Sequence, residues 1–199
     1  ADGARLDELR ALSENPLIQG FTTNPTLMRK AGVVDFEEFA REAAAIAGSR
    51  PVSFEVFSDE FDEMERQAET IAGWGPNVFV KIPVTDTSGA SSAALVRRLA
   101  ARGIKLNVTA LLTVEQVEAV AACLEPEVPA FVSVFAGRIA DTGRDPVPTM
   151  KQAAVVLREL PHALLLWASP RELLNVFQAD EAGCDVIAAT SDLLGKLVL

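Results

Sequence analysis

Hydrophobic residues follow two alternating patterns along the chain. Short, nearly continuous apolar runs are each followed by a longer stretch with apolar residues at helical spacing. The predicted strands are Leu17–Phe21, Pro51–Phe57, Asn77–Val84, Lys105–Leu111, Ala130–Ala136, Ala163–Ala168 and Val186–Ala189. The predicted helices are Leu6–Glu14, Phe36–Ala47, Glu60–Trp74, Ser91–Arg102, Val114–Leu124, Val147–Glu159, Pro170–Ala182 and Asp192–Leu197. Strands that alternate with helices in this way predict a parallel sheet covered by helices.

Residues at the ends of several predicted helices fit the same division. Gly103 and Gly183 follow predicted helices, where a glycine commonly forms the C-cap. Thr113 precedes a helix whose first turns carry acidic and amide side chains, which suits a helix N-terminus. Pro170 follows Ser169 and is predicted to occupy the first position of the next helix.

The number of these units predicts the fold. Seven strands each lead into a helix, and the helix at Leu6–Glu14 comes before the first of them, so we expect an eighth strand that ends near Ala1–Asp2. Eight such units predict a closed (β/α)8 TIM barrel, a single domain over residues 1–199 with an incomplete first strand. An open doubly wound sheet is the structural alternative. No G-x-G-x-x-G follows any predicted strand, which disfavours the dinucleotide-binding version of that fold.

Composition narrows the class of protein. Apolar residues make up 49% and charged residues 23% of the 199 residues, as in ordinary globular domains. The chain has no long apolar run, and its first residues lack the basic and apolar regions of a signal peptide, so we expect a cytoplasmic protein without a membrane span. A formal net charge of -10 argues against a nucleic-acid partner. One histidine and two distant cysteines form no metal-ligand cluster, so no metal is expected.

A lysine interrupts one of the apolar strands. Lys81 lies in the strand predicted at Asn77–Val84 among valine, phenylalanine and isoleucine, although lysine is rarely buried. A structural lysine held in an ion pair is one interpretation. The other is a covalent nucleophile, because a lysine amine that loses its hydration can attack a carbonyl group. Polar residues on the neighbouring strands favour the catalytic interpretation.

Other predicted strands also carry polar side chains near their C-terminal ends, where barrel active sites lie. Residues two apart point to the same face of a strand, so the members of each pair are expected to face the barrel interior together. The residues concerned are Ser53 with Glu55, Asn107 with Thr109, Ser133 with Phe135, and Thr22, Thr23 and Asn24 at the end of the first strand. Any one of them could be a satisfied polar group. Burying so many would be costly, which predicts a solvated site at the barrel mouth.

Two arginines follow the late strands of the predicted barrel. Arg138 comes after the strand at Ala130–Ala136, and Arg171 comes after the strand at Ala163–Ala168. Ser169 lies beside Arg171 at a predicted helix N-terminus, and such groups together can bind a phosphate. Ion-paired surface arginines are the alternative. Because TIM barrels often bind phosphate in this region, we expect Arg138, Arg171 and Ser169 to form a phosphate-binding site.

Several segments resemble the transaldolase family. Gly20-Phe-Thr-Thr-Asn-Pro-Thr-Leu is similar to its G-x-T-[ST]-N-P signature, and Val80-Lys81-Ile-Pro-Val is similar to the strand that carries its Schiff-base lysine. Ser133-Val-Phe-Ala-Gly-Arg138-Ile resembles its S-x-F-x-G-R-I segment. Ala168-Ser169 with Arg171, and Ala182-Gly183-Cys184-Asp185, match later segments. The resemblance extends over almost the whole chain, in the same order.

The resemblance implies a barrel of the class I aldolase type and a role for each matching residue. Lys81 would form a Schiff base with a ketose phosphate, and Glu55 would relay protons with a water held by Thr109. Asp2 would take the proton whose removal allows the carbon–carbon bond to break. The residues implied in substrate binding are Asn24, Thr22, Ser53, Asn107, Ser133 and Phe135. The implied chemistry requires no metal or organic cofactor, so none is expected.

The resemblance also separates two activities. The transferases of the family resemble this chain at Glu55 and Phe135, whereas the aldolases typically carry glutamine and tyrosine at those places, and this chain contains no tyrosine. We therefore expect a transaldolase that moves a dihydroxyacetone unit from fructose 6-phosphate or sedoheptulose 7-phosphate to an aldose phosphate. The length resembles the short branch of the family that includes fructose 6-phosphate aldolase.

Three other functions are alternatives to a transaldolase. A fructose 6-phosphate aldolase would form the same intermediate without an obligatory acceptor. A non-catalytic sugar-phosphate-binding barrel would not need Lys81, Glu55 and Asp2 together. A phosphate-binding isomerase would need a base and an electrophile on other strands, and the lone His162 precedes a strand, on the wrong face.

Two further expectations concern the acceptor and the assembly. The motifs do not specify an aldose phosphate of three, four or five carbons. We expect its binding residues in loops such as Asp86–Gly89 and Thr142–Pro148. The family's final helix, absent after Leu199, often contacts a neighbouring subunit, and we expect a homo-oligomer.

Overall fold

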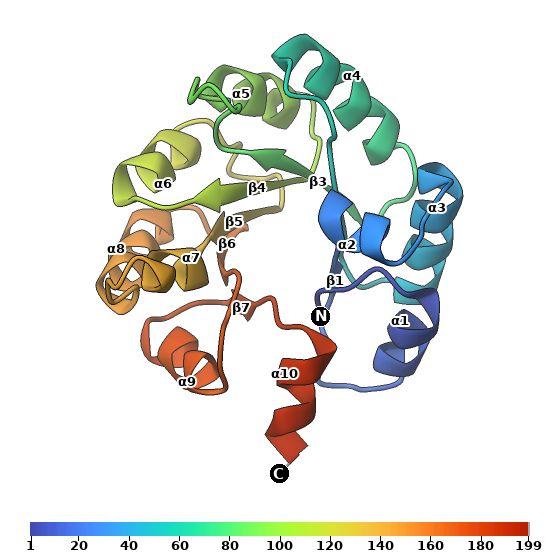
Figure 1. The fold of residues 1–199 in the computed structure, drawn as a ribbon. Helices are drawn as coiled ribbons and strands as arrows, with labels where there is room; N and C mark the ends of the chain where they lie inside the picture. Colours follow the sequence, from blue (N-terminus) through green and yellow to red (C-terminus); the bar gives the residue numbers. More distant parts are fainter. Residues whose placement is uncertain (199) are drawn as a thin grey trace.

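Parallel strands curl around a central axis, and helices surround them (Figure 1). The structure is a computed structural model that describes residues 1–198. Its strands are β1 (Phe21–Thr22), β2 (Val52–Glu55), β3 (Val78–Pro83), β4 (Leu106–Leu111), β5 (Ala130–Val134), β6 (Ala163–Trp167) and β7 (Val186–Ile187). They lie side by side in chain order, and each is parallel to the next.

The first residues of the chain close the barrel between β7 and β1. Asp2 forms parallel bridges to Thr22 and to Thr190. The Asp2 N–H donates to the Ala189 carbonyl at 2.8 Å, and the Gly3 N–H donates to the Thr22 carbonyl at 3.0 Å. This segment therefore occupies the position predicted for the eighth strand, between the two ends of the sheet (Figure 1). The prediction of a (β/α)8 barrel is confirmed.

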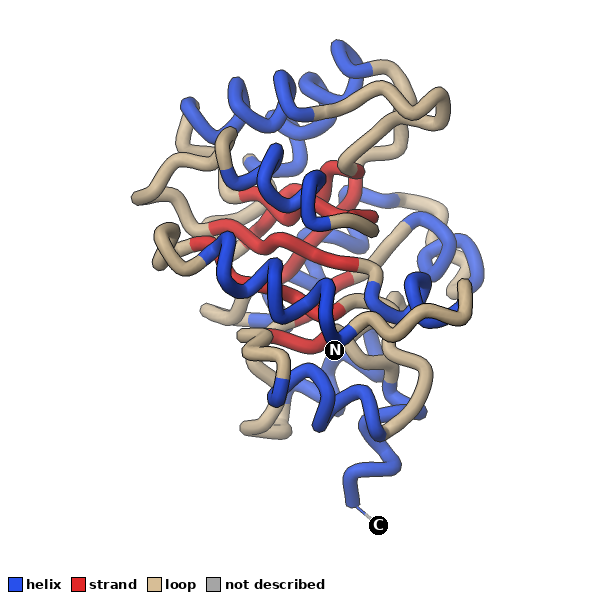
Figure 2. The backbone as a smooth tube through the Cα atoms, turned by 90° about the vertical axis from the view of Figure 1, so that its left-hand side faces the viewer, coloured by secondary structure: helices blue, strands red, loops and turns tan. Residues whose placement is uncertain are grey.

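Helices cover the outer side of the strands, as Figure 2 shows from the side. They are α1 (Leu6–Ser13), α2 (Pro25–Lys30), α3 (Phe36–Ala47), α4 (Phe61–Ala72), α5 (Ala93–Ala101), α6 (Val114–Ala121), α7 (Ala136–Asp141), α8 (Val147–Leu157), α9 (Leu174–Glu181) and α10 (Ser191–Gly195), with a 3-10 turn at Lys196–Val198. The short helices α2 and α7 were not predicted, because six residues give too little periodicity to see. Within residues 1–198, no helix is both long and apolar enough to cross a lipid bilayer.

The strand predicted at Leu17–Phe21 is wrong in position. Leu17 is 80% exposed in a turn, and the strand consists of Phe21 and Thr22. Ile18 and Phe21 are buried, so the apolar run is partly a loop that folds under the barrel. An apolar run alone does not show where sheet pairing begins, which explains the error.

The helix predicted to start at Pro170 starts four residues later, at Leu174. The Asn175 side-chain oxygen accepts the backbone N–H groups of Arg171 at 2.7 Å and Glu172 at 3.1 Å. Asn175 is the second residue of α9, and its side chain accepts hydrogen bonds from the backbone of the turn that precedes the helix. Ser169 is therefore not at a helix N-terminus, which corrects one premise of the predicted phosphate site.

Other predicted helix ends are confirmed. Gly103 and Gly183 follow α5 and α9 with φ angles of 75° and 79°, the left-handed conformation that glycine adopts without strain. Thr113 caps α6, because its hydroxyl accepts the N–H of Gln116 at 3.3 Å in a capping box.

The strands are buried on both faces, as parallel barrel strands usually are. Phe54, Val80 and Trp167 point outward and are fully buried against the helices. Inside the barrel, the Phe79 and Phe131 rings lie 4.7 Å apart and form part of an apolar floor. Nearer the carboxyl ends of the strands, the side chains that face the barrel interior are polar, and they form the candidate site.

Candidate active site

Lys81 presents a buried amine inside the barrel. Its register partners on the neighbouring strands are Glu55 of β2 and Asn107 of β4. The Lys81 side chain is 10% exposed, its Nζ donates to the Thr23 carbonyl at 3.1 Å, and it lies 3.2 Å from Glu55 Oε2. Two oxygen atoms thus fix the direction of the amine. Once deprotonated, an amine held in this way can attack a carbonyl carbon.

A chain of side-chain hydrogen bonds crosses the barrel at the level of Asn107. The Ser133 hydroxyl donates to Asn107 Oδ1 at 2.6 Å, and Asn107 Nδ2 donates to the Ser53 hydroxyl at 3.0 Å. All three side chains are 2–3% exposed. We expected solvent at the barrel mouth to satisfy these groups, but they satisfy one another, which removes the cost of burying them. The chain also fixes the orientation of the Asn107 amide.

A cavity of about 60 Å³ opens beside the Lys81 amine. Residues of the chain start and of the β1 end contribute polar groups to its wall, namely Asp2, Thr22 and Asn24. Thr109 of β4 faces the same space and is 3% exposed. Polar groups from the chain start, from β1 and from β4 in the middle of the sheet therefore meet here, because the sheet curls into a barrel.

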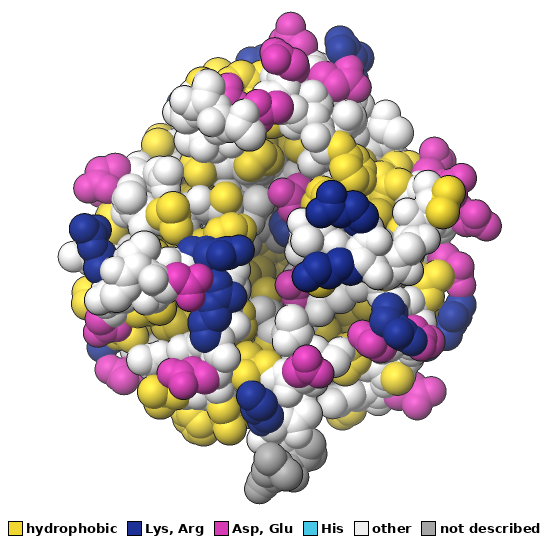
Figure 3. All heavy atoms as spheres, in the orientation of Figure 1, with side chains coloured by type: hydrophobic (Ala, Val, Ile, Leu, Met, Phe, Trp, Pro, Cys, Tyr) yellow, Lys and Arg dark blue, Asp and Glu magenta, His cyan; other side chains and the backbone are white. Residues whose placement is uncertain are grey.

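The rest of the cavity wall combines apolar and polar groups. Phe135, Leu166 and Ala168 provide apolar surface, and Asn107, Ser133 and Ser169 add hydrogen-bonding groups. Figure 3 shows the hollow at the centre of this face, with basic side chains beside it. A ligand with an apolar backbone and several hydroxyls fits a wall of this composition.

The Asp2 carboxyl is a buried acid in this wall. Its Oδ1 has no hydrogen-bond partner within the described residues. Burial raises the pKa of the Asp2 carboxyl above its ordinary value, and the positive charge of Lys81 opposes that rise. A carboxyl with a raised pKa can accept and return a proton more readily near neutral pH than an exposed aspartate can.

Asn24 connects the cavity with the unpredicted helix α2. Its Oδ1 accepts the Leu27 N–H at 3.0 Å and caps the helix. The capping bond uses the side-chain oxygen, so the two Nδ2 donors are left for a ligand. The Asn-Pro pair thus serves both the helix and the cavity wall, since Pro25 suits the first helical position.

The predicted phosphate residues lie on two segments that touch at the rim of the cavity. Arg138 lies on α7, whereas Ser169 and Arg171 precede α9. Ser169 has a φ of 58°, and its carbonyl lies so close to Gly137 that a Cβ atom there would be 1.6 Å from that oxygen. Glycine at position 137 therefore allows the two segments to approach, which brings Arg138 and Arg171 to one side of the mouth.

Gly137→Ala is expected to destabilise the protein by about 1–3 kcal/mol, the usual cost of overpacking a close contact. The new methyl group cannot fit without a shift of the Ser169 backbone. Urea unfolding followed by circular dichroism measures the change. Gly195→Ala is the matched control, since a Cβ there meets no atom within 4 Å. Equal midpoints for the two variants would contradict the close contact.

Four of the predicted site residues lie outside the cavity wall. Glu55 reaches the site through its contact with Lys81, and Ser53 lies under Asn107 as a hydrogen-bond partner. Arg138 and Arg171 lie at the rim, with side chains 63% and 43% exposed. The structure thus brings the predicted catalytic residues together and places Ser53 in a supporting position.

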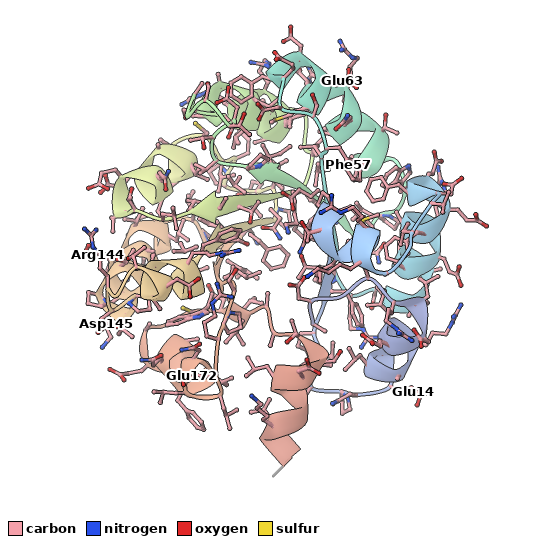
Figure 4. The ribbon with its side chains drawn as sticks, in the orientation of Figure 1. Glu14, Phe57, Glu63, Arg144, Asp145 and Glu172 are labelled. Atoms are coloured by element: carbon pink, nitrogen blue, oxygen red, sulfur yellow. The ribbon has the colours of Figure 1, made fainter. Side chains whose placement is uncertain are left out.

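The loops predicted to bind the acceptor do not line the cavity. Arg144 and Asp145, in the loop at Thr142–Pro148, lie at the outer edge and point away from the mouth (Figure 4). The loop at Asp86–Gly89 is tied to its neighbour, because the Thr87 N–H donates to Asp59 Oδ1 at 2.8 Å. Within the described residues, neither loop contributes to the cavity wall, so a role of these loops toward an acceptor stays a prediction.

Sequence reasoning missed two residues of the site. The motif that contains Gly137 does not indicate the close contact at this glycine, and no sequence pattern points to Asp141. Asp141 accepts two hydrogen bonds from Arg171 and lies 3.7 Å from Arg138 Nη1. The three-residue spacing between Arg138 and Asp141 predicts an ion pair only when a helix is known to be there.

Comparison with known proteins gives a consistent family match. The family model described as Transaldolase/Fructose-6-phosphate aldolase matches residues 1–199. A "Probable transaldolase 2" of Listeria monocytogenes is 36% identical over 197 residues, which cover 98% of this chain and 86% of the relative. A "Probable transaldolase" of Dehalococcoides mccartyi is 30% identical over 198 residues, which cover 99% of this chain and 88% of the relative.

Solved structures support the fold. A monomeric dihydrodipicolinate synthase variant aligns with a TM-score of 0.64 and 13% identity over 92% of this chain. The dihydrodipicolinate synthase of Thermotoga maritima aligns with a TM-score of 0.63 and 14% identity, also over 92% of this chain. The alignments cover 62% and 63% of those proteins, so this chain spans less than two thirds of their length.

Proposed function

The chain belongs to the transaldolase/fructose-6-phosphate aldolase family, and we propose that it transfers a dihydroxyacetone unit from a ketose phosphate to an aldose phosphate through a Schiff base on Lys81. The observation that carries this proposal is the Lys81 amine, held beside a cavity by the Thr23 carbonyl and Glu55. A purely structural ion pair would need neither the cavity nor the unpartnered Asp2 carboxyl in its wall. An aldolase-type enzyme needs both.

The reaction begins with the donor, fructose 6-phosphate or sedoheptulose 7-phosphate. Its phosphate binds Arg138, Arg171 and Ser169, which directs the carbonyl end toward Lys81. The amine attacks C2 to form a carbinolamine, and loss of water gives a protonated Schiff base. Glu55, 3.2 Å from Nζ, relays the protons of this step with a water held by Thr109.

Cleavage of the C3–C4 bond follows. Asp2 takes the proton of the C4 hydroxyl, C4 becomes an aldehyde carbon, and the bonding electrons move into the iminium to give an enamine on Lys81. Hydroxyls of the retained three-carbon unit are held by Asn24, Asn107 and Ser133. The aldehyde phosphate leaves, an aldose phosphate takes its place, and the same steps run in reverse. The transfer consumes no water overall.

Two residues favour transfer over release of dihydroxyacetone. Glu55 is an acid/base 3.2 Å from the Lys81 Nζ, and with its water it controls how the enamine partitions between addition to an acceptor and hydrolysis. Phe135 presents a ring without a hydroxyl to the cavity, so it supplies no group that could orient a water for hydrolysis. A fructose 6-phosphate aldolase is the second candidate, because the family model includes that activity.

Glu55→Gln is expected to raise the release of free dihydroxyacetone relative to transfer and to lower overall turnover by roughly 10²-fold or more. The amide keeps the shape of the side chain but can neither carry a charge nor exchange protons with the water, so it no longer controls the partition of the enamine between transfer and hydrolysis. Product ratios measured with an aldose phosphate present give the partition. Glu63→Gln, the same change at the outer edge on α4, is the control (Figure 4). An unchanged ratio would remove the role assigned to Glu55.

The activity itself is tested by the release of glyceraldehyde 3-phosphate from fructose 6-phosphate. Release only in the presence of an aldose phosphate establishes a transferase, and a panel of three-, four- and five-carbon acceptors identifies the preferred partner. Release without an acceptor makes the protein an aldolase. No release from either ketose phosphate, with or without acceptor, would overturn the proposed function in favour of a sugar-phosphate-binding barrel.

A further inference from the structure

One carboxylate joins the two arginines at the rim of the cavity. Arg171 donates from Nε to Asp141 Oδ1 at 3.0 Å and from Nη2 to Asp141 Oδ2 at 2.5 Å. This two-point contact fixes the plane of the guanidinium as well as its position. Arg138 Nη1 lies 3.7 Å from the same Oδ2. Neither arginine forms another ion pair within residues 1–198.

The backbone that carries Arg171 is also held in place. Asn175, 7% exposed, accepts the Arg171 N–H at 2.7 Å, and Gly137 lies against Ser169 two residues earlier. A fixed backbone leaves the long arginine side chain as the mobile part. Asp141 restrains the Arg171 side chain. Asp141 lies on α7, the helix that also carries Arg138.

The ion pairs leave donors for a ligand. A guanidinium has five N–H donors, and Asp141 uses two of those of Arg171. Arg138 donates no side-chain hydrogen bond within the described residues, so its donors are available. Two positive groups and one negative group leave a net charge of about one positive unit, and the shared carboxylate reduces the repulsion between the guanidinium groups. The Arg171 hydrogen bond holds the pKa of the Asp141 carboxyl below its ordinary range, so this carboxylate keeps its charge near neutral pH.

We propose that Asp141 is a positioning residue that assembles Arg138 and Arg171 into one preformed site for the phosphate group of the substrate. This inference rests on the proposed function for the identity of the substrate. The change in phosphate binding when Asp141 is removed distinguishes this role from simple competition. If Asp141 orders the arginines, its removal weakens phosphate binding; if it only competes with phosphate for them, its removal strengthens binding.

The test compares Asp141→Asn, Asp141→Glu and the wild-type protein with fructose 6-phosphate and with unphosphorylated fructose as donors. Asp141→Asn is expected to raise the KM for fructose 6-phosphate by roughly two- to fivefold, the upper part of the range for an exposed ion pair. The kcat for this donor and kcat/KM for fructose should change less than twofold, and Asp141→Glu should recover part of the loss. Asp145→Asn, a neighbouring carboxylate that points away from the mouth, should behave as wild type (Figure 4).

Three results would overturn the proposal: an unchanged or lower KM for fructose 6-phosphate in Asp141→Asn, an equal loss with unphosphorylated fructose, or no recovery in Asp141→Glu. Inorganic phosphate provides a second measurement that does not need turnover. Its stabilisation of the wild-type protein against heat should exceed that of Asp141→Asn. If wild type is inactive but this difference is found, the proposed function fails and the positioning role of Asp141 stands. Equal stabilisation by phosphate rejects the role of Asp141 whether or not the enzyme is active.

Discussion

Lys81→Ala is expected to lower the transfer of dihydroxyacetone from fructose 6-phosphate by several orders of magnitude, as loss of a covalent nucleophile usually does. The alanine leaves no group that can bond to C2, and without the iminium the electrons of the breaking C3–C4 bond have no acceptor. The remaining cavity still holds Asp2 and Thr109, and the two arginines remain at its rim, so substrate can bind without reacting. Rates measured with a coupled assay for glyceraldehyde 3-phosphate give the size of the loss.

A chemical trap separates loss of the nucleophile from loss of folding. Borohydride added during turnover should reduce the Schiff base and fix one three-carbon unit on the wild-type protein, visible by mass spectrometry and located on the peptide that contains Lys81. The Lys81→Ala protein should remain unmodified while keeping a wild-type circular dichroism spectrum. Lys151→Ala, which removes a surface lysine paired with Glu181, is the matched control. Near-normal turnover or an adduct in Lys81→Ala would reject the mechanism.

Residues with a strong local signature were predictable from sequence. Lys81 stands out because a lysine in an apolar strand contradicts the rule for buried parallel strands. Glu55 and Thr109 follow from the two-residue period, which fixes the face of a strand even when its ends are uncertain. The eighth strand position at Asp2 follows from counting helices and strands, and the bridges of Asp2 to Thr22 and Thr190 agree with it.

Features that depend on contacts between distant segments were not predictable. Ser53, Asn107 and Ser133 form their hydrogen bonds only because the closed barrel brings three strands together, so a pattern of polar residues could not distinguish mutual pairing from solvation. The same holds for Asp141, whose partner Arg171 is 30 residues away in sequence. Ser169 was assigned to a helix N-terminus because Pro170 follows it, yet Asn175 holds the intervening segment as a turn.

Asp2→Asn is expected to lower kcat by about 10²–10⁴-fold, the range for loss of a general base. The Asp2 carboxyl lies in the cavity wall, and its Oδ1 has no hydrogen-bond partner within the described residues. The charged groups that act on its pKa are Lys81, Glu55 and the N-terminal amine. The asparagine cannot take the C4 hydroxyl proton, whereas Schiff base formation at Lys81 does not require Asp2. Borohydride should therefore still modify Lys81 in Asp2→Asn, now with the whole uncleaved donor instead of a three-carbon unit, although turnover is lost. Loss of the adduct as well would show that Asp2 acts before cleavage.

The pH dependence distinguishes a catalytic Asp2 from a structural one. Burial raises the pKa of the Asp2 carboxyl, so the acidic limb of kcat in the wild-type protein should lie above the ordinary aspartate value of about 3.9. Between these two pKa values the folded state binds more protons than the unfolded state, so this group lowers the free energy of unfolding as pH rises through that window. Asp2→Asn should remove that decrease from the stability curve, whereas Asp7→Asn, at an exposed carboxylate, should leave it in place. A stability curve that keeps the decrease in Asp2→Asn would assign it to another group, and the base in the mechanism would then have to be sought elsewhere in the cavity.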